Sequence, residues 1–129
     1  MTATVTGFHH VKLPVSDLAR SRDWYERVLG LEVVLEFADD DGVVRGVALR
    51  LPDGGDAGIA LREDPTRAAA LAGFDPVALL VPERAQVEQR RARMDELGER
   101  RGEIVTGSGG GSVLAVHDPD GLEIRLYAD

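Results

Sequence analysis

The chain has 129 residues, of which 43% are hydrophobic and 29% are charged, and its formal net charge is -8. This length and composition are typical of one soluble globular domain, whereas the acidic balance argues against a nucleic-acid partner, which would need clustered Lys and Arg. The sequence contains no cysteine, which excludes disulfides and thiolate chemistry. Residues 1–7 lack a leader pattern and no apolar run is long enough to cross a bilayer, so we expect a cytoplasmic protein with no membrane partner.

The first half of the sequence predicts a strand, a helix and three more strands. Residues 8–15 alternate as a strand does, and Ser16 or Asp17 can cap the helix that follows, which Gly30 ends. The buried stripe of this helix is expected to consist of Leu18, Ser21, Trp24, Tyr25, Val28 and Leu29. Further strands are expected at 31–37, 43–51 and 57–62, with turns at 39–42 and 52–55.

The second half predicts the same order of elements. Residues 77–81 are apolar enough for a buried strand, Pro82 fits the first turn of a helix, and Gly98 ends that helix. The inner stripe of the helix is expected to be Val87, Arg91, Met94 and Leu97. A short strand is expected at 103–105, a flexible glycine-rich loop at 107–112, and the last two strands at 113–117 and 122–127. The alanines of the connector 64–73 favour one helical turn.

An internal repeat organises these elements. Residues 10–15 are HVKLPV, and residues 76–81, which lie 66 positions later, are PVALLV. Each segment is followed by a helix closed by Leu-Gly and then by about three strands. One βαβββ module cannot easily cover its own sheet, so two modules should pair. We therefore predict an α+β fold in one domain, 1–129, whose modules 1–66 and 67–129 form a cupped mixed sheet around a central cleft.

Three groups of residues carry a resemblance to a known family. They are His10-Val11 with residues 15–18, Trp24-Tyr25 with residues 28–31, and Asp118-Pro119-Asp120-Gly121 with Ile124. In this combination the chain resembles the vicinal oxygen chelate superfamily, also called the glyoxalase/bleomycin resistance/dioxygenase superfamily. The resemblance implies a homodimer. It also implies a divalent metal in the cleft, held by His or Glu from the first and last strand of each module.

At the four positions where the resemblance places metal ligands, this chain has His10, Ala60, Pro76 and Arg125. Alanine and proline have no side-chain donor, and arginine stays protonated without a lone pair to give. A guanidinium ~4 Å from a divalent cation would repel it by roughly 8 kcal/mol at an effective dielectric of ~20. One histidine does not hold a metal that needs three or four protein ligands. We therefore predict that the protein has no metal and no other cofactor.

Without a metal, the cleft is expected to bind a small molecule through apolar walls and a few polar anchors. The candidate walls are Val47, Leu49, Ala60 and Ala78, and the candidate anchors are His10, Lys12, Arg62, Glu123, Arg125 and Tyr127. The predicted function is metal-independent sequestration of a drug or metabolite, similar to the bleomycin-resistance branch. The acidic net charge suits a basic ligand, but Lys12, Arg62 and Arg125 suit an anionic one. A competing interpretation is that Arg125 pairs with Glu123 and only seals the old metal position.

Two other classes of function stay open. The first is a lyase, isomerase or dioxygenase that uses His10 and Glu123 for proton transfer, or a metal site rebuilt from His10, His117, Asp118 or Glu123. The second is an accessory domain whose partner is another protein. A structural hydrogen bond is the simpler expectation for His117, and His9 is expected on the opposite face of its strand from His10. The glycine-rich loop lacks the lysine of a phosphate-binding loop, so we expect either a mobile lid or a hairpin connection.

Overall fold

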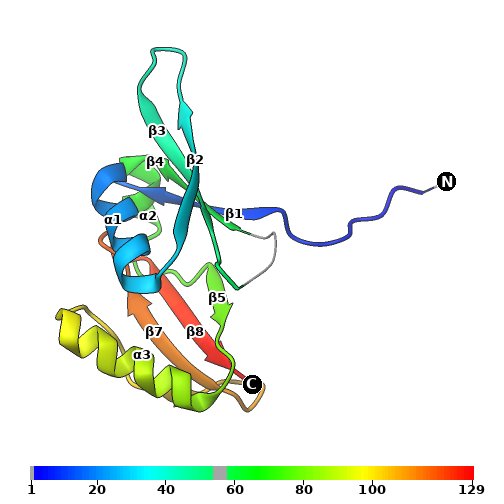
Figure 1. Cartoon of the computed structure of the whole chain (residues 1–129), viewed down its shortest axis with the longest axis vertical. Coiled ribbons are helices and arrows are strands. Elements are labelled where there is room, and N and C mark those ends of the chain that lie inside the picture. Colours follow the sequence, from blue (N-terminus) through cyan, green and yellow to red (C-terminus); the bar gives the residue numbers. More distant parts are fainter. Residues whose placement is uncertain (1, 54–57) are drawn as a thin grey trace. The chain divides into compact units, whose positions relative to one another are not determined.

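The computed structural model describes residues 2–53 and 58–129 and divides the chain into two compact units (Figure 1). One unit ends at Pro65, and the other begins at Thr66. Each contains a four-stranded mixed sheet, so the predicted α+β class and the repeated βαβββ order are confirmed. Among the described residues, no helix combines the length and the apolar character needed to span a membrane.

The first unit consists of β1, α1, β2, β3 and β4, in that order along the chain. Their bounds are His10–Val15, Leu18–Leu29, Glu32–Ala38, Val44–Arg50 and Gly58–Glu63. The sheet order is β1-β4-β3-β2, in which β1 runs parallel to β4 and the other neighbours are antiparallel. The expected turn at 52–55 and the expected strand start at residue 57 fall partly outside the described residues.

Capping interactions define the two ends of helix α1, and an apolar stripe defines the face that it buries. Asp17 has an extended backbone, and its carboxylate accepts a hydrogen bond from the Arg20 N–H at 3.1 Å, which is the usual N-cap interaction. At the other end Gly30 adopts a left-handed φ of 72°, and its N–H donates to the Glu26 carbonyl. All six stripe residues expected from the sequence are buried.

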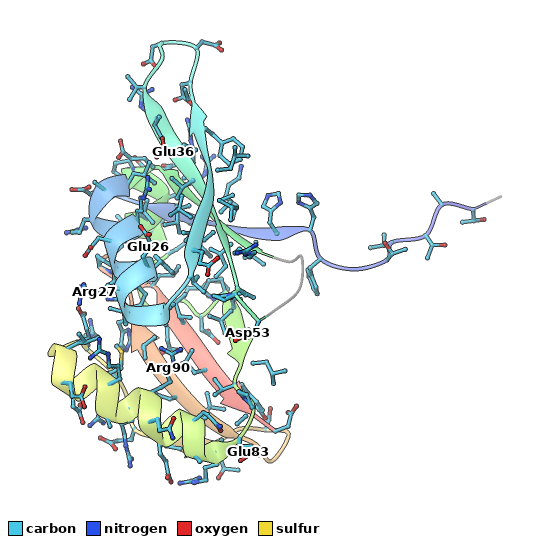
Figure 2. The ribbon with its side chains drawn as sticks, viewed as in Figure 1. Glu26, Arg27, Glu36, Asp53, Glu83 and Arg90 are labelled. Carbon is cyan, nitrogen blue, oxygen red and sulfur yellow. The ribbon has the colours of Figure 1, made fainter. Side chains whose placement is uncertain are left out.

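The core of the first unit lies between α1 and one face of the sheet. The sheet contributes Leu13, Val15, Val47, Leu49, Ile59 and Leu61. Burial of such side chains stabilises the unit by roughly 1.5–3 kcal/mol each. At the surface, Arg22 of α1 forms ion pairs with Glu26 on the same helix and with Glu36 on β2, both labelled in Figure 2. Within the described part of this unit, no helix lies on the opposite face of the sheet.

The second unit repeats this plan after a short helix at the boundary. The bounds are Pro65–Ala70 for α2, Val77–Leu80 for β5, Arg84–Leu97 for α3, Val105–Thr106 for β6, Ser112–His117 for β7 and Glu123–Ala128 for β8. The sheet order β5-β8-β7-β6 matches that of the first unit. Helix α3 packs on β7 and β8 through Val87 and Met94, whereas Arg91 and Leu97 are only half-buried. The inner stripe is therefore narrower than the sequence predicted.

Helix α3 begins later than its proline suggested. The N–H of Val81 still donates to the Tyr127 carbonyl, so the chain follows the sheet through residue 81. The N-cap is Glu83, whose carbonyl accepts from Gln86 and Val87, and Pro82 precedes the helix. The proline thus ends the strand segment and does not open the helix.

The glycine-rich segment forms a closed turn between β6 and β7. The Gly107 N–H donates to the Gly111 carbonyl at 2.7 Å, and the Gly110 N–H donates to the Gly107 carbonyl at 2.9 Å. A Cβ at Gly111 would lie 2.4 Å from both the Ala128 carbonyl oxygen and the Tyr127 ring. Glycine is therefore required here by the close approach of β8. The interpretation of this segment as a hairpin connection fits the structure, whereas its composition alone suggested a flexible loop.

The turn before β8 is built by one buried carboxylate. Asp118 is 4% exposed, and its Oδ1 accepts hydrogen bonds from the N–H groups of Asp120 and Leu122, each at 2.9 Å. Gly121 closes the turn with a φ of 80°, a conformation that favours glycine. The Asp-Pro-Asp-Gly motif thus has a structural role in aiming the chain into β8.

Candidate functional site

A pocket of about 570 Å³ lies on the first unit's sheet. Its described lining residues come from β1 to β4 and from His9, which directly precedes β1. Most of them alternate with the core residues, so the pocket belongs to the face opposite α1. The volume falls within the range of about 300–1,000 Å³ that is usual for small-molecule sites.

Small residues in the two central strands make the floor of this pocket. Strand pairing places Lys12, Ala60, Ala48 and Leu35 in one row across β1, β4, β3 and β2. In the neighbouring row, His10 pairs with Gly58. Because Ala60, Ala48 and Gly58 carry at most a methyl group, a hollow remains above them between the longer side chains of the lining.

A bulge in β2 supplies the apolar wall. Val33 pairs with Leu49 and Leu35 pairs with Ala48, so Val34 is the extra residue. Such an insertion re-aims the side chains that follow it. Val34, Leu35 and Phe37 all line the pocket and are 54%, 53% and 46% exposed. This exposure of large apolar groups around a concavity is typical of a ligand site.

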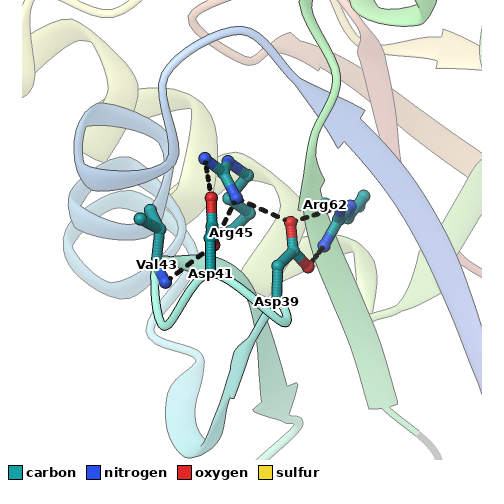
Figure 3. A network of polar contacts seen from close by, with 5 residues as sticks. All are labelled: Asp39, Asp41, Val43, Arg45 and Arg62. Atoms are coloured by element: carbon teal, nitrogen blue, oxygen red, sulfur yellow. Dashed lines mark hydrogen bonds and ion pairs between the residues drawn. The ribbon is translucent and has the colours of Figure 1, made fainter.

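Carboxylates neutralise both arginines of the lining. Arg62 donates two hydrogen bonds to Asp39, at 2.7 and 3.0 Å, and Asp39 also binds Arg45 at 2.8 Å (Figure 3). The hydrogen bonds from Arg62 and Arg45 lower the pKa of Asp39 to about 2, and the same contact with Asp39 raises the pKa of Arg62. Arg50 is paired with Glu32 on the neighbouring strand. Both guanidinium groups therefore have a carboxylate partner within the first unit.

The β1 side of the pocket is polar. The Nδ1 atoms of His9 and His10 are 2.8 Å apart, and the two rings meet edge to face. His9 was expected on the opposite face from His10, but both residues line the pocket. His9 precedes β1, so its side chain need not follow the alternation of that strand. Lys12 is exposed and has no hydrogen bond or ion pair with any described residue.

Of the binding residues expected from the first half, the pocket brings together His10, Lys12, Leu49, Ala60 and Arg62. Val47 is fully buried on the α1 side and is absent from the described lining. Val47 therefore does not contribute to this pocket, and the sequence does not show which face of β3 the helix covers. The sequence also missed Val34, Leu35, Phe37, Ala48 and Arg50. The exposure of Val34, Leu35 and Phe37 would have been the signal for this wall. The sequence does not show that exposure, because it depends on the bulge in β2.

The candidates from the second half lie on the open face of β5 and β8. Ala78 pairs with Arg125, and Glu123, Arg125 and Tyr127 alternate with buried β8 residues. The Arg125 Nε donates to Glu123 at 2.9 Å, and the Arg125 Nη1 lies 3.1 Å from the Asp75 carboxylate. The pairing of Arg125 with Glu123, one of the two roles expected for this arginine, is therefore present. A role in ligand binding for these four residues stays a prediction.

The His117 backbone N–H donates to the Arg100 carbonyl, but its buried Nδ1 has no partner within the described residues. His10 starts β1, Pro76 directly precedes β5, and Arg125 is held by two carboxylates. Across residues 2–53 and 58–129, no group of three or more His, Cys, Asp or Glu side chains could hold a metal ion. The donors that are present do not fit such an ion.

Comparisons with known proteins identify the family of this fold. The family model described as Glyoxalase/Bleomycin resistance protein/Dioxygenase superfamily matches residues 7–126. No curated protein matches the chain.

Solved structures match over nearly the whole chain. TnmS3, an antibiotic binding protein from Streptomyces sp. CB03234, has 22% identity and a TM-score of 0.78, covering 98% of each chain. Lactoylglutathione lyase from Agrobacterium tumefaciens has 18% identity and a TM-score of 0.74, over 98% of this chain and 96% of that one. The fosfomycin resistance protein FosX from Listeria monocytogenes has 16% identity and a TM-score of 0.74, over 98% and 95%. At these identities the likeness shows the fold alone.

Proposed function

We propose that this chain, which belongs to the Glyoxalase/Bleomycin resistance protein/Dioxygenase superfamily, is a metal-independent binding protein that sequesters a drug or metabolite. The observation that carries the proposal is the pocket of about 570 Å³ on the first unit's sheet. Its alanine floor and the exposed wall of Leu35 and Phe37 offer a compact molecule apolar surface on two sides. Burial of that surface supplies the affinity.

Metal independence rests on the donor set. Ala60 offers no lone pair, and the Arg125 guanidinium would repel a cation. Asp75 and Glu123 already bind this guanidinium. The enzyme alternative that uses Glu123 as a base would first have to release it from Arg125, so binding is the simpler proposal.

The assembly is proposed on the resemblance alone. We infer a cytoplasmic homodimer, and we propose that Ala78, Glu123, Arg125 and Tyr127 on the open face of the second unit's sheet also contribute to ligand binding.

The test combines metal analysis with a ligand screen. Protein purified without a chelator is expected to contain no stoichiometric Zn, Ni, Fe or Mn, and divalent metals should leave the melting temperature unchanged. An organic ligand at a hundred times its Kd adds about 2.7 kcal/mol to the free energy of unfolding, which corresponds to a rise of roughly 10 °C for a chain of this size. Stoichiometric metal that the substitution His10→Ala removes would overturn the proposal.

A pocket-filling variant locates the binding. Ala60→Phe places a ring on the floor and is expected to abolish the thermal shift produced by the ligand. Ala92→Phe adds the same atoms to the exposed surface of α3 and should leave the shift intact. Equal shifts in the two variants would show that the ligand binds elsewhere.

A further inference from the structure

The charge of the pocket is opposite to that of the chain. The chain carries 23 acidic residues against 15 Lys and Arg, yet no Asp or Glu is among the described residues that line the pocket. The permanently charged side chains among them are Lys12, Arg50 and Arg62. The electrostatic potential near a concave site, and not the net charge of the whole protein, determines which ions enter it. The acidic net charge is therefore no argument for a cationic ligand in this pocket.

Two of these three cations are already neutralised. Asp39 holds Arg62 through two hydrogen bonds, and Glu32 is paired with Arg50. Each pair is close to neutral as seen by a ligand. An anion that recruited either guanidinium would have to compete with a carboxylate already in contact with it.

Lys12 is the cation that remains available. It is the only lysine in the sequence, it lines the pocket, and it has no polar partner among the described residues. Its ammonium group carries hydrogen-bond donors and no acceptor. His10 lies two residues earlier on the same face of β1 and lines the same side of the pocket.

The strand pairing fixes the direction in which a ligand would lie. Lys12 stands on one edge strand, Leu35 on the other, and Ala60 and Ala48 lie between them. Three strand spacings amount to ~14 Å between the two edge backbones. This span fits a molecule with a flat apolar body of about two fused rings and a charged group at one end. An anionic group screened from water by that body would interact with the ammonium more strongly than in bulk solvent.

We propose that the ligand of this pocket is an apolar organic anion, of the aromatic carboxylate class, whose carboxylate binds Lys12 and whose body lies on Ala60 and Ala48 against the Leu35 and Phe37 wall. The inference rests on the proposed binding function and adds the chemical class and orientation of the ligand. It resolves the opposing charge cues of the sequence in favour of an anion.

Three probes of one shape test the sign of the charge. Isothermal titration calorimetry with 2-naphthoate, 2-naphthamide and 2-naphthylmethylamine compares an anionic, a neutral and a cationic head group on the same rings. The full chain is expected to bind the carboxylate about tenfold more tightly than the amide, in line with a charge-assisted hydrogen bond, and to bind the amine most weakly.

Substitutions of Lys12 assign the preference to this residue. Lys12→Met keeps an unbranched stem of similar length and should lose the tenfold preference for the carboxylate while its affinity for the amide stays the same. Lys12→Arg should retain the preference. Arg93→Met removes a cation from the exposed face of α3 and serves as the control that should bind like the parent protein.

The single lysine also allows a direct readout. Reductive methylation with ¹³C-formaldehyde labels Lys12 and the terminal amine, and the Lys12 methyl resonance is expected to shift with 2-naphthoate and not with the amine probe. Equal affinities for the carboxylate and the amide, or an unchanged preference in Lys12→Met, would overturn the anion proposal and leave the binding function standing. Failure of all three probes to bind would count against both.

Discussion

Replacement of Asp118 by alanine is expected to destabilise the second unit by about 2–4 kcal/mol. The carboxylate accepts two backbone hydrogen bonds, and the one from Leu122 is buried. A buried N–H that loses its partner costs about 1–3 kcal/mol, and hydrogen bonds to a charged group lie at the upper end of the usual range. The Leu122 N–H would carry most of the loss, because the Asp120 N–H is only partly buried and can bind water.

Asp118→Asn is the matched comparison for this effect. The amide oxygen can accept the same two hydrogen bonds without the charge, so its loss should stay within about 1 kcal/mol. Urea unfolding followed by far-UV circular dichroism measures both changes, and amide hydrogen exchange at Leu122 reports the buried bond directly. The reasoning would be refuted if the alanine variant lost less than about 0.5 kcal/mol, or if Asn cost as much as Ala.

Three further changes test other parts of the structure. Gly111→Ala should destabilise the protein by about 1–3 kcal/mol because its Cβ would overlap the Ala128 carbonyl, whereas Gly109→Ala should change stability by less; thermal denaturation compares them. Asp39, whose pKa is lowered to about 2 from 3.8, stabilises the folded state above pH ~4, and this contribution is lost as the pH falls toward 2; Asp39→Asn should flatten the stability profile in that window. Arg125→Glu should not produce a stoichiometric metal site, as measured by elemental analysis, because the other inert positions remain.

Equal stability of the two glycine variants would show that the turn can move away from β8. An unchanged acid slope in Asp39→Asn would show that Asp39 binds its arginines no better when folded than when unfolded. Tight, stoichiometric metal in Arg125→Glu would show that this arginine alone had excluded the ion.

Local features of the sequence predicted helix α1, the C-terminal ends of both long helices and the repeat, but not the start of α3 or the width of its buried stripe. The six buried residues of α1 follow from helical periodicity, and the caps at Asp17, Gly30 and Gly98 follow from the chemistry of helix ends. These interactions span only a few residues, so a short window contains all the information that they need. The order of elements then gave the βαβββ plan through its repetition along the chain.

The pocket depends on contacts that are distant in sequence. Asp39 and Arg62 are 23 residues apart, and nothing local pairs them. The phase of β3, which puts Val47 under the helix, is set by packing of the sheet on α1. The glycine-rich turn was expected to be flexible from composition, whereas the structure shows that Tyr127 crowds Gly107 and Gly111 and that Gly110 has a φ of 92°.

The bulge in β2 has a consequence for how this protein could change its specificity. Leu31, Val33, Leu35 and Phe37 alternate along the chain, and a regular strand would send all four to the same side. The extra residue instead leaves the half-buried Val33 opposite the core residue Leu49 and turns Leu35 and Phe37 toward the pocket. Deletion of Val34 would therefore return both side chains to the interior and strip the cavity of its wall in one genetic step. A change in length at this point would therefore alter the wall of this pocket more than the substitution of a single side chain.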